Sequence, residues 1–157
     1  MKKLSHYNSA GQVSMVDVGG KEATHRTATA RAFVAMAPRV IRALPNNAKG
    51  DPLEVARIAG INGAKKTWEL IPLCHQLPLA HVGLEFRVRR NGIEVIATAS
   101  TIAQTGVEME AMTAAAVAAL TIYDMTKALD KGIEIREVYL VEKTGGKSGT
   151  FVRGGRK

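Results

Sequence analysis

Small apolar and polar residues alternate between residues 24 and 35, a pattern typical of a half-buried β-strand. Residues 80–90 and 92–101 predict two more strands. They are joined at Arg90-Asn91-Gly92, and because Asn-Gly is a strong hairpin signal, we expect these strands to pair with each other. The apolar-rich residues 133–142 predict a last strand.

The segments between these strands have helical signals. A proline predicts the start of a short helix over residues 38–44. Asp51 is a favourable N-cap and is followed by a proline at the first helical position, so a second helix is expected over residues 52–68. Its inner face is expected to carry Val55, Ile58, Ala59 and either Ile61 or Asn62. Residues 107–131 predict a long Ala/Met/Leu-rich helix that Gly132 ends.

The predicted order, apart from the extra short helix, is the split β-α-β-β-α-β order of ferredoxin-like folds. We therefore expect an α+β protein with an antiparallel sheet and its helices on one face. The open sheet face is expected to be apolar enough to attract a partner, which favours an oligomer. Residues 1–157 are expected to form a single domain with a mobile N-terminal arm (1–22) and a glycine-rich basic C-terminal tail (143–157).

The composition fits one packed domain, with 46% hydrophobic residues and only 4% aromatic residues, which indicates a core of aliphatic side chains and alanine. No segment approaches the roughly 18 apolar residues of a membrane span, and no apolar signal-peptide core follows the first residues. The single cysteine excludes an internal disulfide and a cysteine-rich zinc site. We expect a cytoplasmic protein without membrane contact.

The formal net charge of +8 predicts an anionic partner. Nucleic acid, acidic lipid and a polyanionic small molecule all fit this charge. The few aromatic residues do not suffice for the stacking surface that single-stranded nucleic acid requires, so we expect no nucleic-acid partner. Phosphate groups on a small substrate fit better.

The segment from Ile71 to Leu79 is the first candidate site. It places the only cysteine, Cys74, beside His75 between two prolines, which hold the backbone stiffly. The alternative is a buried loop with a core cysteine and a hydrogen-bonded histidine. The four histidines lack the spacing of metal ligands, so no metal site is predicted.

The long predicted helix carries the other candidates for proton transfer. Asp124 and Lys127 are three residues apart and share a helix face, either as an ordinary surface ion pair or, in a pocket, as an acid and a base. Glu108 and Glu110 lie in the first turn, where acidic residues also complement the helix dipole. Glu110 and Asp124 are about 21 Å apart along a helix, so a site that uses both must combine two subunits.

Basic residues supply candidate phosphate ligands. Lys143 and Lys147 belong to a glycine-rich segment that resembles a phosphate-binding loop in composition, without the Walker register. A solvated basic tail is the alternative. Lys49 precedes a predicted helix N-terminus, where anions bind. Lys65 fits an exposed helix face equally well, and Arg26 fits an ordinary exposed strand position.

Several longer motifs follow one another over nearly the whole chain: Met15-Val16-Asp17-Val18, Ala56-Arg57-Ile58-Ala59-Gly60-Ile61, Ala64-Lys65-Lys66-Thr67-Trp68, Leu70-Ile71-Pro72-Leu73-Cys74-His75, Thr105-Gly106-Val107-Glu108-Met109-Glu110-Ala111, Ala118-Ala119-Leu120-Thr121-Ile122-Tyr123-Asp124-Met125, Lys127-Ala128 and Gly145-Gly146-Lys147-Ser148-Gly149. On these motifs the chain resembles the cyclic pyranopterin monophosphate synthase family of molybdenum cofactor biosynthesis. Two positions depart from the family pattern, since Gln76 stands where proline is common and Thr126 where cysteine is common. Neither is a proposed catalytic group.

The resemblance implies a lyase that converts 3′,8-cyclo-7,8-dihydroguanosine 5′-triphosphate, a GTP-derived nucleotide, to cyclic pyranopterin monophosphate with release of pyrophosphate. It implies a homohexamer, a trimer of dimers, with sites at a subunit interface. No cofactor is implied, apart from magnesium that can accompany the triphosphate. The implied catalytic residues are Asp124 and Lys127. The implied substrate-binding residues are Leu73, Cys74, His75, Met109, Glu110, Glu108, Lys49, Lys65, Lys143, Lys147 and Arg26.

A noncatalytic nucleotide- or RNA-binding module of ferredoxin-like fold is the alternative function. The basic charge and the predicted order permit it, but the strands lack the paired aromatic residues of RNA-recognition sheets. RNA affinity would fall steeply with salt, whereas turnover of one triphosphate would be less sensitive.

Overall fold

The computed structural model describes residues 6–154, so the predictions for residues 1–5 of the arm and 155–157 of the tail lie outside the described part of the chain. Along the chain the elements are β1 (Thr24–Ala35), α1 (Pro38–Ala43), the 3-10 helix η1 (Leu44–Asn46), α2 (Pro52–Lys65), α3 (Thr67–Leu70), β2 (Leu79–Arg89), β3 (Gly92–Ala103), α4 (Glu108–Thr126), β4 (Glu134–Thr144) and β5 (Phe151–Val152).

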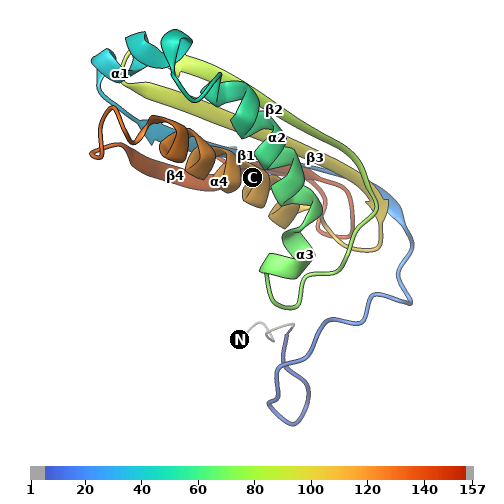
Figure 1. Ribbon diagram of the computed structural model, residues 1–157. Helices are drawn as coiled ribbons and strands as arrows, with labels where there is room; N and C mark the ends of the chain where they lie inside the picture. Colours follow the sequence, from blue (N-terminus) through green and yellow to red (C-terminus); the bar gives the residue numbers. More distant parts are fainter. Residues whose placement is uncertain (1–5, 155–157) are drawn as a thin grey trace.

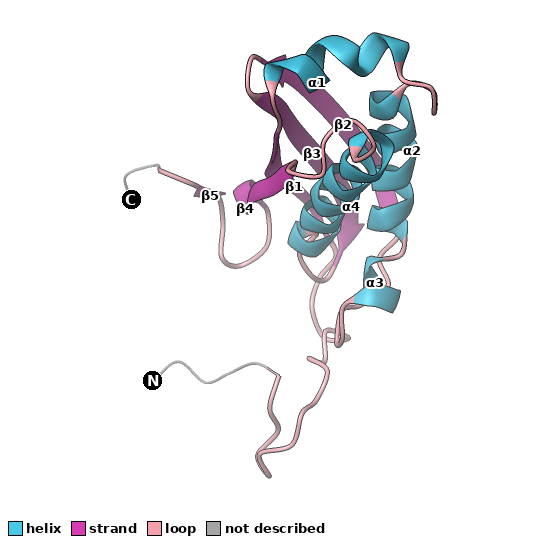
Figure 2. Cartoon of the chain, turned by 60° about the vertical axis from the view of Figure 1, so that its left-hand side comes forward, coloured by secondary structure: helices cyan, strands magenta, loops and turns pink. Residues whose placement is uncertain are grey.

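The strands form one antiparallel sheet in the order β2-β3-β1-β4-β5. Helices α2 and α4 lie together on one face of this sheet (Figures 1 and 2). The first four strands have the ferredoxin-like arrangement, so the predicted α+β class is confirmed. The fifth strand was not predicted: part of the basic tail pairs with β4.

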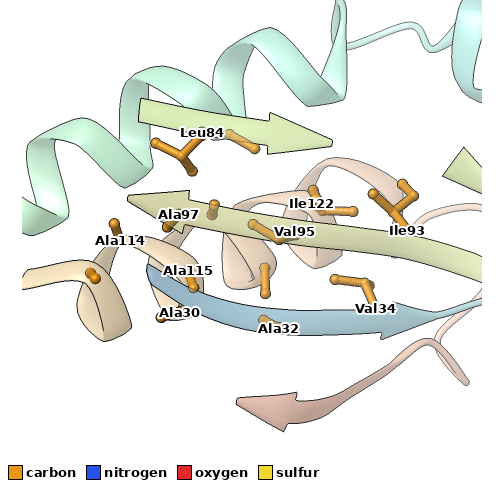
Figure 3. Packing of buried hydrophobic residues seen from close by; sticks show 14 of the residues in the cluster. Ala30, Ala32, Val34, Leu84, Ile93, Val95, Ala97, Ala114, Ala115 and Ile122 are labelled. Carbon is orange, nitrogen blue, oxygen red and sulfur yellow. The ribbon is translucent and has the colours of Figure 1, made fainter. Parts of the chain in front are cut away.

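Alternation along the central strands builds the core (Figure 3). Ala30, Ala32 and Val34 of β1 are fully buried, and Ile93, Val95 and Ala97 of β3 lie beside them. Helix α4 covers these side chains with its own buried alanines and Ile122. Because most of these residues are small, the helix lies close to the sheet, and the predicted core of aliphatic residues and alanine is confirmed.

The contact between α2 and α4 corrects the predicted inner face of α2. Its buried residues are Pro52, Ala56, Gly60, Gly63 and Ala64, whereas Ile58 is 62% exposed. A Cβ on Gly60 would lie 2.6 Å from Leu84 Cδ2 and 3.0 Å from the Ala114 carbonyl oxygen. The small residues thus allow the two helices to approach closely. Val55 and Ile58 are exposed, whereas Ile61 is partly buried against the core, as predicted.

The predicted ends of two helices, and the role predicted for Gly132, were wrong. Helix α2 ends at Lys65, and a break at Lys66 separates it from the single turn of α3. Helix α4 ends at Thr126, five residues earlier than predicted, and the residues that follow form an exposed turn. In that turn the Asp130 carboxylate accepts a hydrogen bond from the Gly132 N–H, so the glycine closes the turn and not the helix.

The β2–β3 hairpin is confirmed, but its glycine has another role. The turn consists of Arg90 and Asn91, and Gly92 is the first residue of β3. A side chain at Gly92 would collide with the Val34 carbonyl oxygen and with the Phe33 ring. Gly92 is therefore required for close packing against β1, not for the turn conformation.

The open face of the sheet carries a polar network that the expectation of an apolar face did not include, beside apolar residues such as Ile102, which is 62% exposed. Arg31 donates to Glu94 at 2.6 Å and to Glu137, and Arg89 donates to Glu94 at 2.9 Å. Tyr139 accepts a further hydrogen bond from Arg31 at 3.1 Å. This network satisfies the charges within one chain. Within residues 6–154, no helix combines the length and apolarity needed to cross a membrane.

Candidate active site

The predicted site residues gather mainly at the two ends of α4. At its N-terminal end a cavity of about 470 Å³, here called the acidic cavity, contains six of them. Its lining residues are His6, Val16, Lys21, Leu73, Cys74, His75, Leu77, Thr105, Gly106, Glu108, Met109 and Glu110. The two predicted substrate-binding segments, far apart in sequence, therefore share one cavity.

A tight turn presents Cys74 and His75 to the acidic cavity. The Cys74 N–H donates to the Ile71 carbonyl at 3.3 Å, with Pro72 second in the turn. Leu73, the third residue, has φ 66°, a position that normally favours glycine or asparagine. The left-handed backbone costs a leucine roughly 1–2 kcal/mol. The stiff backbone expected from the prolines takes the form of a tight turn. Leu73, which lines the cavity, has a strained backbone in this turn.

The N-terminal arm fixes the ring of His75. Nε2 of His75 lies 2.9 Å from the Val16 carbonyl oxygen. A carbonyl oxygen only accepts hydrogen bonds, so Nε2 carries the proton. In the neutral ring Nδ1 is then left as the proton acceptor, which suits a base or an acceptor for a ligand.

Glu110 is the buried acid of the acidic cavity, with 4% of its surface exposed. Burial, together with the nearby charge of Glu108, raises the pKa of Glu110 to about 7. A carboxyl group with such a pKa can donate or accept a proton near neutrality. Burial and the Glu110 charge also raise the pKa of the Cys74 thiol, so Cys74 is not an activated nucleophile.

The C-terminal end of α4 carries the second group of predicted residues, here called the charged cluster. Lys127 Nζ lies 2.6 Å from Asp124 Oδ1, and Lys49 Nζ lies 3.7 Å from Asp124 Oδ2. All three side chains are about half exposed, at 58% for Asp124, 48% for Lys127 and 47% for Lys49. Of the two alternatives for this pair, the single chain shows the surface ion pair.

The unpaired carbonyls at the end of α4 position this cluster. Asn47 Nδ2 donates to the Met125 carbonyl at 2.9 Å, and Lys49 Nζ donates to the Asp124 carbonyl at 3.1 Å. Lys49 therefore lies at the C-terminus of α4, where a cation is favourable, and not at the α2 N-terminus as expected.

The short distance between Asp124 and Lys127 shifts the pKa values of both groups. The hydrogen bond from Lys127, helped by the charge of Lys49, lowers the pKa of Asp124. The same hydrogen bond raises the pKa of Lys127. In the isolated chain both groups therefore stay charged near neutrality. Proton transfer by this pair requires a ligand or a partner that covers it and removes water.

The remaining basic candidates are separate from both groups. Arg26 and Lys147 line a cavity of about 460 Å³, here called the basic cavity, with Gly20, Lys21, Glu22, Thr24 and Gly146. Arg26 also donates to the carbonyls of Ala103 at 2.9 Å and Gln104 at 3.1 Å, so it ties β1 to the end of β3. Lys143 donates to Ser148 of its own loop, and Lys65 is exposed in the last turn of α2.

Comparison with known proteins agrees with the resemblance. The MoaC family profile matches residues 15–146. The chain belongs to the MoaC family. Proteins named cyclic pyranopterin monophosphate synthase from Novosphingobium aromaticivorans and Bordetella avium are each 56% identical to it, over 153 and 152 residues. These alignments cover 96% and 94% of the chain and 98% and 94% of the relatives. The protein of that name from Peptoclostridium acidaminophilum is 49% identical over 153 residues, 96% of the chain and 98% of the relative.

Several cavity residues of this MoaC family member were not singled out by sequence reasoning. Val16 acts through its backbone carbonyl, and Thr105 and Gly106 line the acidic cavity from the loop before α4. These residues belong to motifs of the family resemblance, but a contact made by a backbone group cannot be recognised from the residue type. Lys21 was also missed, because a lone lysine in a polar arm has no distinctive pattern. Within residues 6–154, no group of three or more His, Cys, Asp or Glu residues could hold a metal ion.

Proposed function

We propose that the chain is a lyase of molybdenum cofactor biosynthesis that converts 3′,8-cyclo-7,8-dihydroguanosine 5′-triphosphate to cyclic pyranopterin monophosphate and pyrophosphate. The observation that carries this proposal is the similarity to three synthases, at 49–56% identity over nearly the full chain. The structure supports it with an acid of near-neutral pKa and with exposed lysines for phosphates. We assign no cofactor to the protein, and any magnesium would accompany the triphosphate.

The site is proposed to combine two subunits. Glu110 and Asp124 belong to one straight helix, and fourteen residues at about 1.5 Å each separate them by about 21 Å. A nucleotide does not bridge this distance comfortably. If both groups act on one substrate, the acidic cavity of one subunit must face the charged cluster of another. We propose a homohexamer, a trimer of dimers, with this site at a subunit interface.

Each end of α4 then has a distinct task. The positive charges of Lys49 and Lys127 suit the binding of phosphates and the departure of pyrophosphate. Asp124 and Lys127, once covered, would exchange protons with the substrate, and each would hold the other in position. Glu110 and His75 would hold the ring system and supply or accept further protons during its rearrangement.

Turnover by purified protein tests the proposal. Wild type is expected to form the cyclic monophosphate, whereas Asp124→Ala and Lys127→Ala are expected to lose activity. Lys131→Ala is the matched control, because Lys131 is an exposed lysine of the turn after α4 that lines neither cavity. Circular dichroism and gel filtration would verify folding and assembly. No turnover by folded, assembled wild type would refute the synthase function.

The cellular location is also a proposal. One cysteine gives no internal disulfide for an oxidising compartment, and the proposed substrate derives from GTP, so we place the reaction in the cytoplasm. Detection of the full-length protein mainly in a membrane or secreted fraction would contradict this.

A further inference from the structure

We propose that Lys21 of the N-terminal arm binds the phosphate chain of the substrate. This inference rests on the proposed function and adds to the site a residue that no sequence motif indicated. Lys21 lines both the acidic cavity and the basic cavity, and among residues 6–154 it is the only residue common to the two. It therefore lies where a ligand that extends from one cavity into the other would pass.

The arm is held against the acidic cavity at this point. The Val16 carbonyl accepts the hydrogen bond from His75, and Val16 itself lines the cavity. A turn follows, in which Asp17 Oδ1 accepts from the Gly19 N–H at 2.8 Å and the Lys21 N–H donates to the Val18 carbonyl at 3.0 Å. These bonds direct the arm from the acidic cavity to the basic cavity and place Lys21 between them.

The two cavities differ in charge, so a ligand with an uncharged end and an anionic end would bind across them in one orientation. Glu108 and Glu110 line the acidic cavity, where Lys21 is the only lysine or arginine among residues 6–154. Arg26 and Lys147 join Lys21 in the basic cavity, and Glu22 is the one acidic residue there within the described part of the chain. An uncharged ring fits the first environment and a phosphate chain the second, because lysine and arginine bind phosphate through charge-assisted hydrogen bonds.

The amine of Lys21 is available for such a ligand. Its side chain is exposed, and among residues 6–154 it forms neither an ion pair nor a side-chain hydrogen bond. Arg26 is more constrained, because it already donates to two carbonyls, whereas Lys147 is exposed like Lys21. The Lys21 amine can therefore bind a ligand phosphate without first losing a hydrogen bond or an ion pair.

The first test is kinetic, with Lys21→Ala, Lys21→Gln and Lys21→Arg in the full chain. We expect KM for the triphosphate to rise about tenfold or more in the Ala and Gln variants, because both lose a charge-assisted hydrogen bond to phosphate. The Arg variant is expected to retain most of the affinity, and kcat is expected to change little. Lys131→Ala is the control for the loss of one exposed positive charge.

The second test does not depend on turnover. Calorimetric titration with inorganic tripolyphosphate should show about tenfold weaker binding to Lys21→Ala than to wild type and to Lys131→Ala. Unchanged affinity and KM in the Ala and Gln variants would overturn the inference. So would a fall in kcat alone, which would indicate that Lys21 only positions the arm. If wild type bound tripolyphosphate through Lys21 but did not turn over the nucleotide, only the proposed function would fail.

Discussion

The two ends of α4 differ in almost every physical respect. At the N-terminal end, Glu110 is buried, has no ion-pair partner within residues 6–154 and has a pKa raised to about 7. At the C-terminal end, Asp124 is exposed, ion-paired with Lys127 and Lys49, and has a lowered pKa. One end encloses a cavity lined by two acidic side chains and, among residues 6–154, a single lysine, whereas the charged groups of the other end are about half exposed.

This difference teaches that neither end is a complete site for a phosphorylated substrate. A reactive Asp–Lys pair needs a surrounding that excludes water, and an acidic cavity needs cations for phosphates. Each end has what the other lacks, which supports the proposed assembly of one site from two subunits. Variants that change one end of α4 or the other test this complementarity.

Mixing two inactive variants gives the strongest test. Asp124→Asn and Glu110→Gln are each expected to lose turnover. Subunits mixed at equal amounts after reversible dissociation should recover about a quarter of wild-type activity, because half of the dimers are mixed and one of their two sites is intact. Turnover is measured before and after mixing. Recovery is the expected result, and its absence in assemblies shown by mass spectrometry to be mixed would place each site within one chain.

The pH dependence of stability tests the buried end. The folded-state pKa of Glu110, about 7, lies above its ordinary value of 4.5, so the protonated form favours folding. Wild type should therefore lose stability as pH rises from about 4.5 through 7, by up to roughly 3 kcal/mol, while Glu110→Gln should lack this component. Urea unfolding at several pH values measures it. Parallel profiles for the two proteins would show that Glu110 is already ionised.

The contact that holds the loop of Lys49 against α4 should have a smaller effect. Asn47→Ala removes the hydrogen bond to the Met125 carbonyl and should cost about 1 kcal/mol in urea unfolding. It should also lower turnover, because Lys49 is no longer held at the helix end. Asn46→Ala is the control: this exposed neighbour should change neither quantity. Equal losses in the two variants would mean that the loop is held in another way.

The charged cluster should contribute least to stability. Lys127→Ala and Asp124→Asn should leave Tm within about one degree of wild type at neutral pH, because exposed ion pairs add little to folding. Differential scanning calorimetry measures this. A clear drop in Tm would show that the assembled protein buries the pair, and its dependence on protein concentration would identify the interface.

Sequence patterns predicted much of the fold for identifiable reasons. The alternation along β1 and β3 matches the two faces of a sheet, and Asp51 does cap α2, with its side chain accepting from the Leu53 and Glu54 N–H groups. The inner face of α2 was predicted wrongly because periodicity favours large aliphatic residues. In the structure, glycine and alanine of α2 pack against α4. These small residues let the two helix backbones approach closely, which allows more van der Waals contacts than bulky side chains would.

The candidate residues were found from the sequence, but their grouping was not. Reactive residue types and motifs identified Cys74, His75, Glu110, Asp124 and Lys127. Whether Asp124 is buried, and which backbone carbonyl fixes His75, depends on contacts between segments distant in the chain. Local patterns carry no information about such contacts.

Residue identity and local spacing were enough to recognise the family, the order of the four main strands and the chemical types at the site. Only the tertiary structure decided that Glu110 is buried with a raised pKa, that Asp124 is exposed and paired, and that Lys21 lies between two cavities. Burial and pairing arise from the packing of helices, loops and arm around α4. The same glutamate or lysine would behave differently in another surrounding.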